Sequence, residues 1–200
     1  GDLSEFSKTY GFGPTLKHYK RAFTEFPFLL YLRNTVVIVV FTTIGTLLSC
    51  SVVGYAFACL RWPDRDAISF IVICTMLLPY QVTLIPLFML FRKLGWVNTL
   101  LPLIVPHFFG LPFFIFLLRQ FFLSLPRDLF EAARIDGASE FTILSRIVLP
   151  LSKPALLTVA IFAAMFAWND FLAPLIYLSS ESKKTLAVAL QGMVTEYQTE

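Results

Sequence analysis

The chain has 200 residues, of which 57% are hydrophobic and 14% are charged, and its formal net charge is +3. A soluble globular domain normally carries about a quarter charged residues, so this composition excludes an ordinary soluble domain and predicts an all-α integral membrane protein. The small net charge and the lack of a basic run argue against a nucleic-acid partner.

Residues 1–33 are polar and aromatic, and they contain no apolar run long enough to cross a bilayer. We therefore expect them to form an N-terminal segment outside the membrane, on the extracytoplasmic side. The chain begins at Gly1 and stops after a polar stretch that ends at Glu200. We interpret it as a fragment that lacks terminal helices.

Four long apolar runs predict membrane spans within one domain, residues 34–200. The first run would make a helix of about 40 Å, enough to cross a hydrocarbon core of about 30 Å. Its small residues, such as Gly45 and Gly54, favour close helix packing in lipid. The predicted spans are residues 34–60, 67–91, 98–118 and 155–178.

Proline interrupts the second run at Pro79 and Pro86, and it removes a backbone donor at each position. Two interpretations stay open for this break. It is either a static packing kink or a place where Pro79-Tyr80-Gln81 lines a wetted pathway.

The polar stretch from Ser124 to Pro154 separates the third and fourth runs. Asp128 and Glu131 fit a capping-box pattern at the start of a helix from about residue 126 to residue 136. Gly137 can take a positive φ and end that helix, and Ser139 can cap a second one.

The order of residues in this stretch resembles the EAA signature of the membrane subunits of bacterial binding-protein-dependent ABC importers. Glu131, Ala132 and Ala133 are followed by Gly137, and then by the run from Ile147 to Pro150. The longer match from Glu131 to Ser139, together with Trp168-Asn169-Asp170-Phe171, is similar to the carbohydrate-uptake branch, of the maltose-permease type. This resemblance implies a type I ABC importer transmembrane domain, with about six spans in a full chain and four here.

The resemblance also implies how the chain acts. In this family the loop at residues 124–154 is cytoplasmic and seats in a groove of the ATP-binding subunit, and the subunit moves solute by alternating access. The implied coupling residues are Glu131, Ala132, Ala133, Asp136, Gly137 and Ala138. The residues alone leave a second interpretation open, in which Glu131 only caps its own helix with Asp128.

The implied partners are ABC ATPase subunits, a second permease subunit, an extracytoplasmic solute-binding protein and the lipid of the cell inner membrane, which the chain crosses several times. Basic residues support a cytoplasmic loop weakly: seven lie on that side and four on the other, once residues 1–33 are set aside.

Asp170 interrupts the fourth run, and an ionisable group at that depth usually faces a bundle interior or a water-filled cavity. With Trp168, Asn169 and Gln81 it forms the candidate substrate pathway, since aromatic faces and amides suit a sugar. The alternatives for Asp170 are helix–helix hydrogen bonding and a place at the membrane interface.

No catalytic, metal or cofactor site is expected. None of the nine glycines begins a P-loop pattern, so ATP would be hydrolysed by a partner and the chain is not itself an enzyme. His18 and His107 lie far apart in sequence, and the three cysteines form no CxxC pair. The alternatives from other classes are an ion-coupled secondary transporter or channel, which needs more intramembrane ionisable groups, and a structural scaffold, which leaves the EAA spacing unexplained.

Overall fold

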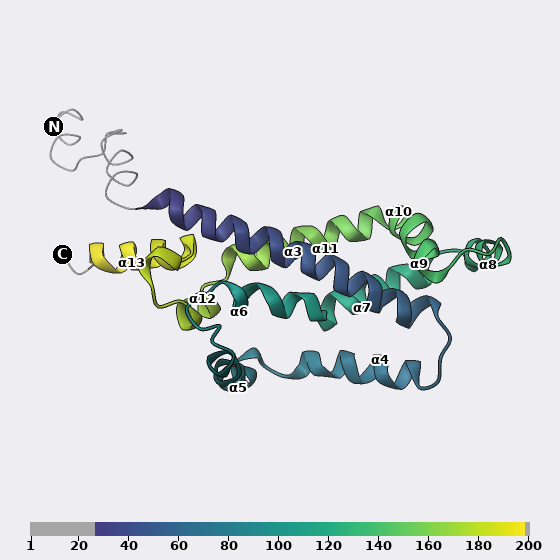
Figure 1. Ribbon diagram of the computed structural model, residues 1–200, viewed down its shortest axis with the longest axis horizontal. Helices are drawn as coiled ribbons and strands as arrows, with labels where there is room; N and C mark the ends of the chain where they lie inside the picture. The colour runs from purple at the N-terminus through teal and green to yellow at the C-terminus, as the bar shows by residue number, and fades with distance from the viewer. Residues whose placement is uncertain (1–26, 199–200) are drawn as a thin grey trace, which may run out of the picture.

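The structure is a computed structural model that describes residues 27–198, and this part of the chain contains helices and turns but no β-strand. Figure 1 shows α8 at one end of the long axis and α13 toward the other, with α3, α7 and α11 between them. The elements are α3 (Phe28–Cys59), α4 (Arg65–Cys74), η1 (Thr75–Leu77), α5 (Tyr80–Lys93), α6 (Leu101–Ile104), η2 (Val105–Phe109), α7 (Pro112–Leu123), α8 (Arg127–Ile135), α9 (Glu140–Ile143), the π-helix η3 (Leu144–Val148), α10 (Leu149–Leu151), α11 (Lys153–Asn169), α12 (Leu172–Tyr177), η4 (Glu181–Lys183) and α13 (Leu186–Gln198).

The central helix α3 is longer than the first apolar run predicted. It begins at Phe28 rather than at Asn34, because the apolar residues from Phe28 to Leu32 continue the helix across the single charge of Arg33. An arginine near a helix end can extend its head group toward the interface. The last six residues of the predicted N-terminal segment therefore belong to α3, and residues 1–26 lie outside the described part.

Within residues 27–198 two helices are long and apolar enough to cross a membrane, Phe28–Cys59 and Leu101–Leu123. The number rises to four if each of two bent helix pairs counts as one span. The predicted second span is such a pair, since the helix of Arg65–Leu77 meets Tyr80–Lys93 at 97°. Pro79 takes extended backbone between them. The break expected at Pro79 therefore divides residues 67–91 between two helices.

The predicted fourth span is also divided. Helix α11 ends at Asn169, Asp170 takes extended backbone, and the short helix α12 follows. At its other end α11 meets the helical segment Glu140–Leu151 at 81°. Pro150 and Pro154 lie on either side of this bend, where each removes a backbone donor.

The main core forms where α3 packs on α7 and α11. At Gly54 an added Cβ would lie 3.3 Å from the Leu118 Cβ, so glycine lets the backbones of α3 and α7 approach closely. The core then continues out of the spans into the polar stretch, where it includes Phe130 and Ile143. One continuous apolar core therefore joins the loop to the helices.

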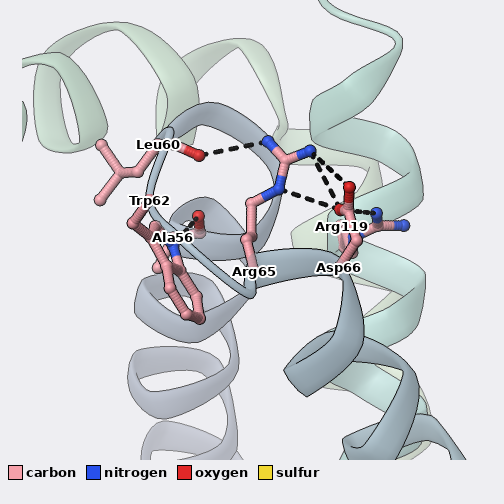
Figure 2. A network of polar contacts seen from close by, with 6 residues as sticks. All are labelled: Ala56, Leu60, Trp62, Arg65, Asp66 and Arg119. Atoms are coloured by element: carbon pink, nitrogen blue, oxygen red, sulfur yellow. Dashed lines mark hydrogen bonds and ion pairs between the residues drawn. The ribbon is translucent and has the colours of Figure 1, made fainter.

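A polar network fixes the turn between α3 and α4. Figure 2 shows the Arg65 guanidinium between two acceptors, the Leu60 carbonyl at 3.2 Å and the Asp66 carboxylate at 3.0 Å. Arg119 of α7 lies 3.6 Å from the same carboxylate, and the Trp62 indole N–H donates to the Ala56 carbonyl at 3.4 Å. These contacts hold the start of α4 beside α7.

The far end of the molecule, opposite α8, is closed by bonds between distant segments. Asn98, at a φ of +62°, accepts from the backbone N–H of Ser180 at 3.0 Å and donates to its hydroxyl at 2.7 Å. The Tyr31 hydroxyl donates to Glu181 at 2.8 Å, and Thr35 accepts from the Leu186 N–H at 2.9 Å. Residues 179–186 are thus fixed to the start of α3 and to the turn at Asn98.

Candidate functional site

Helix α8 is anchored by one aromatic residue. Phe130 is only 4% exposed and packs into the main core, while Asp128 and Leu129 beside it are exposed. The helix begins after Pro126 without a side-chain cap, so the predicted capping box of Asp128 and Glu131 does not form. The helix itself lies within one residue of its predicted bounds at each end.

The C-terminus of α8 closes at Gly137 as predicted. Gly137 has a φ of +81°, its N–H donates to the Arg134 carbonyl, and the Ala138 N–H donates to the Ala133 carbonyl at 2.9 Å. This pair of bonds is a Schellman motif, in which apolar residues on either side of the glycine commonly make contact. Ala133 and Ala138 accordingly both pack against the core.

Helix α9 follows at once, and its predicted cap is present. The Ser139 hydroxyl accepts from the Thr142 N–H at 3.3 Å. The next turn widens into the π-helix η3, just before Pro150, which has no N–H to donate to the turn preceding it. Two short helices joined at a glycine, as expected, make up the loop.

An ion pair crosses the turn between the two helices. Arg134 Nε lies 2.7 Å from Glu140 Oε1, and its second nitrogen lies 3.2 Å from Oε2. The buried Tyr55 of α3 donates its hydroxyl to the same carboxylate. The hydrogen bond from Arg134, followed by that from Tyr55, lowers the pKa of Glu140 below its ordinary value.

The residue pattern did not identify this cluster. Arg134 and Glu140 are six residues apart, which is outside the three- or four-residue spacing of helix pairs, and they meet only because the chain reverses at Gly137. Tyr55 is a further 85 residues away from Glu140 in sequence. The one sequence feature that indicates this ion pair is Gly137, a glycine that can take a positive φ and that lies between two oppositely charged residues.

The outward face of the loop carries large apolar side chains. Ile135 is 87% exposed and Phe141 is 76% exposed, on opposite sides of the Gly137 turn. Glu131, Ala132 and Asp136 are also exposed, and within the described residues Glu131 has no ion-pair partner. The six predicted coupling residues therefore divide by exposure: four are exposed, Glu131, Ala132, Asp136 and Gly137, and two are partly buried, Ala133 and Ala138.

A polar cavity of about 470 Å³ separates α8 from the turn between α3 and α4. Its lining includes Glu131 and Glu140, and it also includes four guanidinium groups. These belong to Arg61, Arg65, Arg127 and Arg134. Cations therefore outnumber carboxylates behind the loop, which places the unpaired Glu131 at the edge of a positive region.

The second candidate site lies nearer the far end, around Asp170. This residue is partly buried and lines a cavity of about 490 Å³ with Tyr80, Tyr177 and His107. Its Oδ1 accepts from the Ala173 N–H at 3.3 Å, which helps to begin α12. Asp170 thus has a local backbone contact and also faces a cavity.

The other three predicted pathway residues are not brought to this cavity. Trp168 and Asn169 are exposed, and the Asn169 amide donates to the Met165 carbonyl of its own helix at 2.8 Å. Gln81 is exposed on the first turn of α5, whereas its neighbour Tyr80 lines the cavity. Adjacent residues of a helix lie on different faces, so Tyr80 lines the cavity and Gln81, one position later, does not.

No group of three or more metal-ligating side chains occurs within residues 27–198. Among the cysteines, Cys50 is buried in the main core, where its sulfur accepts from the Leu111 N–H at 3.3 Å. His18 lies outside the described residues.

Residues 50–199 match a family model described as binding-protein-dependent transport system inner membrane component. The chain is 36% identical over 184 residues to the arabinooligosaccharides transport system permease protein AraQ of Halalkalibacterium halodurans, covering 92% of this chain and 66% of the relative. It is also 36% identical over 179 residues to the sulfoquinovosyl glycerol transport system permease protein SmoH of Agrobacterium fabrum, covering 89% and 63%.

Among solved structures, one chain of a bacterial ABC transporter involved in the import of the acidic polysaccharide alginate matches with a TM-score of 0.82 and 30% identity. The match covers 89% of this chain and 62% of that one. The present chain thus spans about two thirds or less of the length of these relatives.

Proposed function

The chain belongs to the binding-protein-dependent transport system inner membrane component family, as a relative of sugar ABC transporter permeases, and from this membership we propose that it moves a sugar across the inner membrane in an ATP-driven importer. In this proposal it is a permease subunit without chemistry of its own. Its partners are an ATPase, a second permease subunit and an external solute-binding protein. The loop at residues 124–154 lies in the cytoplasm and couples the subunit to the ATPase.

The observation that carries the coupling role is the apolar pair at the tip of the loop. Ile135 and Phe141 are almost fully exposed although each is large, and they flank the fixed turn at Gly137. Exposed aromatic and aliphatic side chains of this kind act as anchors in protein interfaces. The unpaired carboxylate of Glu131 adds a charged group that a basic residue of the ATPase can bind.

The contacts between the loop and α3 support a role in transmitting movement from the ATPase to the membrane helices. Phe130 packs in the same core as α3 and α7, and the Arg134–Glu140 pair is bound by Tyr55 of α3. A displacement of the loop by the ATPase would therefore move the membrane helices with it. We propose that this movement opens the pathway alternately to the two sides of the membrane.

The names of the relatives support a carbohydrate as the solute. They include transport proteins for arabinooligosaccharides and for diacetylchitobiose, as well as an alpha-glucoside permease. Within this chain we propose Asp170 as a pathway residue because it lines a cavity. Gln81, Trp168 and Asn169 remain candidates for contacts with solute or with a partner subunit along their exposed faces.

The test of coupling is the affinity of the ATPase for complexes that carry loop variants. Phe141→Ala should raise the dissociation constant at least tenfold, since anchor residues contribute about 2 kcal/mol or more. The matched control is Phe109→Ala, which removes the same side chain from a position that is 80% exposed outside the loop. Equal effects of the two variants would contradict the assignment of the loop as the docking site.

Glu131 requires its own experiment. Glu131→Ala should weaken ATPase binding and transport without lowering the thermal stability of the subunit, because its carboxylate has no ion-pair partner within the described residues. Reversal of the partner's basic residue should restore part of the binding lost in Glu131→Arg. A variant that unfolds the subunit while ATPase affinity is unchanged would contradict the coupling role.

A further inference from the structure

The cavity beside Asp170 has the composition of a binding site for a small polar molecule. Residues of α3, α5, α6, α11 and α12 enclose it, and its volume of about 490 Å³ is within the usual range for small-molecule pockets. Its walls are largely apolar and aromatic, with contributions from Tyr80, Phe91, Phe166 and Tyr177. A few polar groups lie among them, and their hydrogen bonding distinguishes the site from a packing defect.

Two buried hydroxyl groups in the cavity wall make no hydrogen bond to another described residue. Thr185 is 4% exposed, and its hydroxyl has no hydrogen-bond partner among the described residues. The Tyr177 hydroxyl, which adjoins that of Tyr80, is buried and also lacks a partner at hydrogen-bond geometry. Buried polar groups are almost always satisfied, so these two hydroxyls point to a polar molecule in the cavity.

Thr42 lines the same cavity and shows the contrast. It is as deeply buried as Thr185, but its hydroxyl donates to the Ile38 carbonyl of its own helix at 2.8 Å. The cavity therefore contains one threonine hydroxyl that is already satisfied and one that is free to bind a ligand.

The charged residues of the cavity lining indicate which charge a ligand can carry. Among the described residues that line the cavity, Asp170 is the one carboxylate, and none is a lysine or an arginine. The Ala173 N–H occupies one Asp170 oxygen, which leaves acceptor capacity for hydroxyl donors. In a region of low dielectric, a carboxylate without a cation beside it repels an anionic ligand strongly.

We propose that this cavity is a subsite for a neutral polyhydroxylated solute. Thr185 and Tyr177 bond to solute hydroxyls, Asp170 accepts from them, and the aromatic walls pack against the sugar ring. The single carboxylate discriminates against acidic sugars. This inference rests on the proposed transport of a sugar and names the class of sugar that the chain accepts.

The first test compares the two threonines. The subunit is purified with its partner permease and ATPase, and saturation-transfer NMR measures the binding of maltotriose, arabinotriose and diacetylchitobiose without the external binding protein. For any probe that the parent complex binds, Thr185→Val should raise the dissociation constant about fivefold, which corresponds to the loss of one hydrogen bond. The melting temperature should not change. Thr42→Val makes the same change in shape and should bind as the parent does.

The second test concerns charge. The parent complex should bind no trigalacturonic acid, and Asp170→Asn, whose amide oxygen can still accept from Ala173, should bind it while keeping the neutral probe within about fivefold. Any one of three results would overturn the proposed subsite. These are equal effects of the two threonine variants, binding of the acidic probe by the parent, and no binding of any neutral probe. Loss of the subsite leaves ATPase association intact. Failure of the ATPase to associate overturns the proposed function, and the NMR measurement on the two permease subunits alone then still tests the subsite.

Discussion

The two ends of the molecule are fixed by different means. At the far end, Asn98, Tyr31 and Thr35 bind residues 179–186 through several hydrogen bonds between segments more than 80 residues apart in sequence. At the loop end, the buried Phe130 and Ile143 and one ion-pair cluster connect α8 and α9 to α3, while large apolar side chains are exposed. The far end is bound to its own chain, whereas the loop end exposes the surface that we propose for the ATPase.

The largest expected effect is the loss of the apolar anchor at the loop end. Phe130→Ala should destabilise the subunit by about 3 kcal/mol, since it removes a fully packed aromatic side chain and leaves a cavity. Leu129→Ala, at the adjacent exposed position, should cost less than about 1 kcal/mol. Denaturation followed in detergent measures both, and similar losses would show that α8 is not anchored by Phe130.

At the far end, Asn98→Ala should destabilise by about 2 kcal/mol, because it removes the bonds to Ser180 and places an alanine at positive φ. Asn98→Gly separates the two causes, since glycine accepts this φ and still lacks the amide. The difference between the two variants in thermal unfolding gives the backbone contribution. ATPase affinity should not change in either, in contrast to the loop variants.

Gly137→Val should destabilise by about 1 to 3 kcal/mol through backbone strain alone, since an added Cβ meets nothing within 4 Å. Gly95 is a control outside the loop, with a φ of +69° and equally open space. Gly95→Val should therefore cost a similar amount of stability while keeping ATPase binding, which Gly137→Val should lose. A Gly137→Val subunit that assembles and transports as the parent does would refute the role of this turn.

The polar cluster at the loop end should have a smaller effect. Glu140→Gln should cost about 1 kcal/mol or less, because Arg134 and Glu140 are both partly exposed and solvent screens their attraction. Tyr55→Phe should also cost about 1 kcal/mol by removing one hydrogen bond. A double-mutant cycle measures their coupling, and strictly additive losses would show that Tyr55 and Glu140 act independently.

The smallest effect is the dependence of stability on pH. The pKa of Glu140 is lowered by Arg134, and that of Glu181 is lowered by Lys184 and then by Tyr31. A carboxyl with a depressed folded pKa stabilises the protein fully above its unfolded pKa of about 4.3, and this contribution disappears as the pH falls through the folded pKa. The melting temperature should therefore be flat near neutral pH and fall below about pH 4, with a shallower fall in Glu140→Gln.

The sequence by itself determined the features that depend on neighbouring residues. Composition indicated the membrane, proline and glycine marked the breaks, and Gly137 and Ser139 predicted the turn and the second cap of the loop, because backbone conformation and capping are decided within a few residues. The resemblance to importer permeases, taken from the same loop, was confirmed by the family match.

The tertiary structure alone decided which distant side chains meet. It joined Tyr55 to Glu140, brought Thr185 and Tyr177 to the cavity of Asp170, and left Trp168 and Asn169 outside that cavity. It also set the 97° bend that proline permits but whose angle proline does not specify. Tyr55 and Glu140 are 85 residues apart in sequence, and the other features depend on how helices bend and pack against one another. A local residue pattern carries no information about that packing.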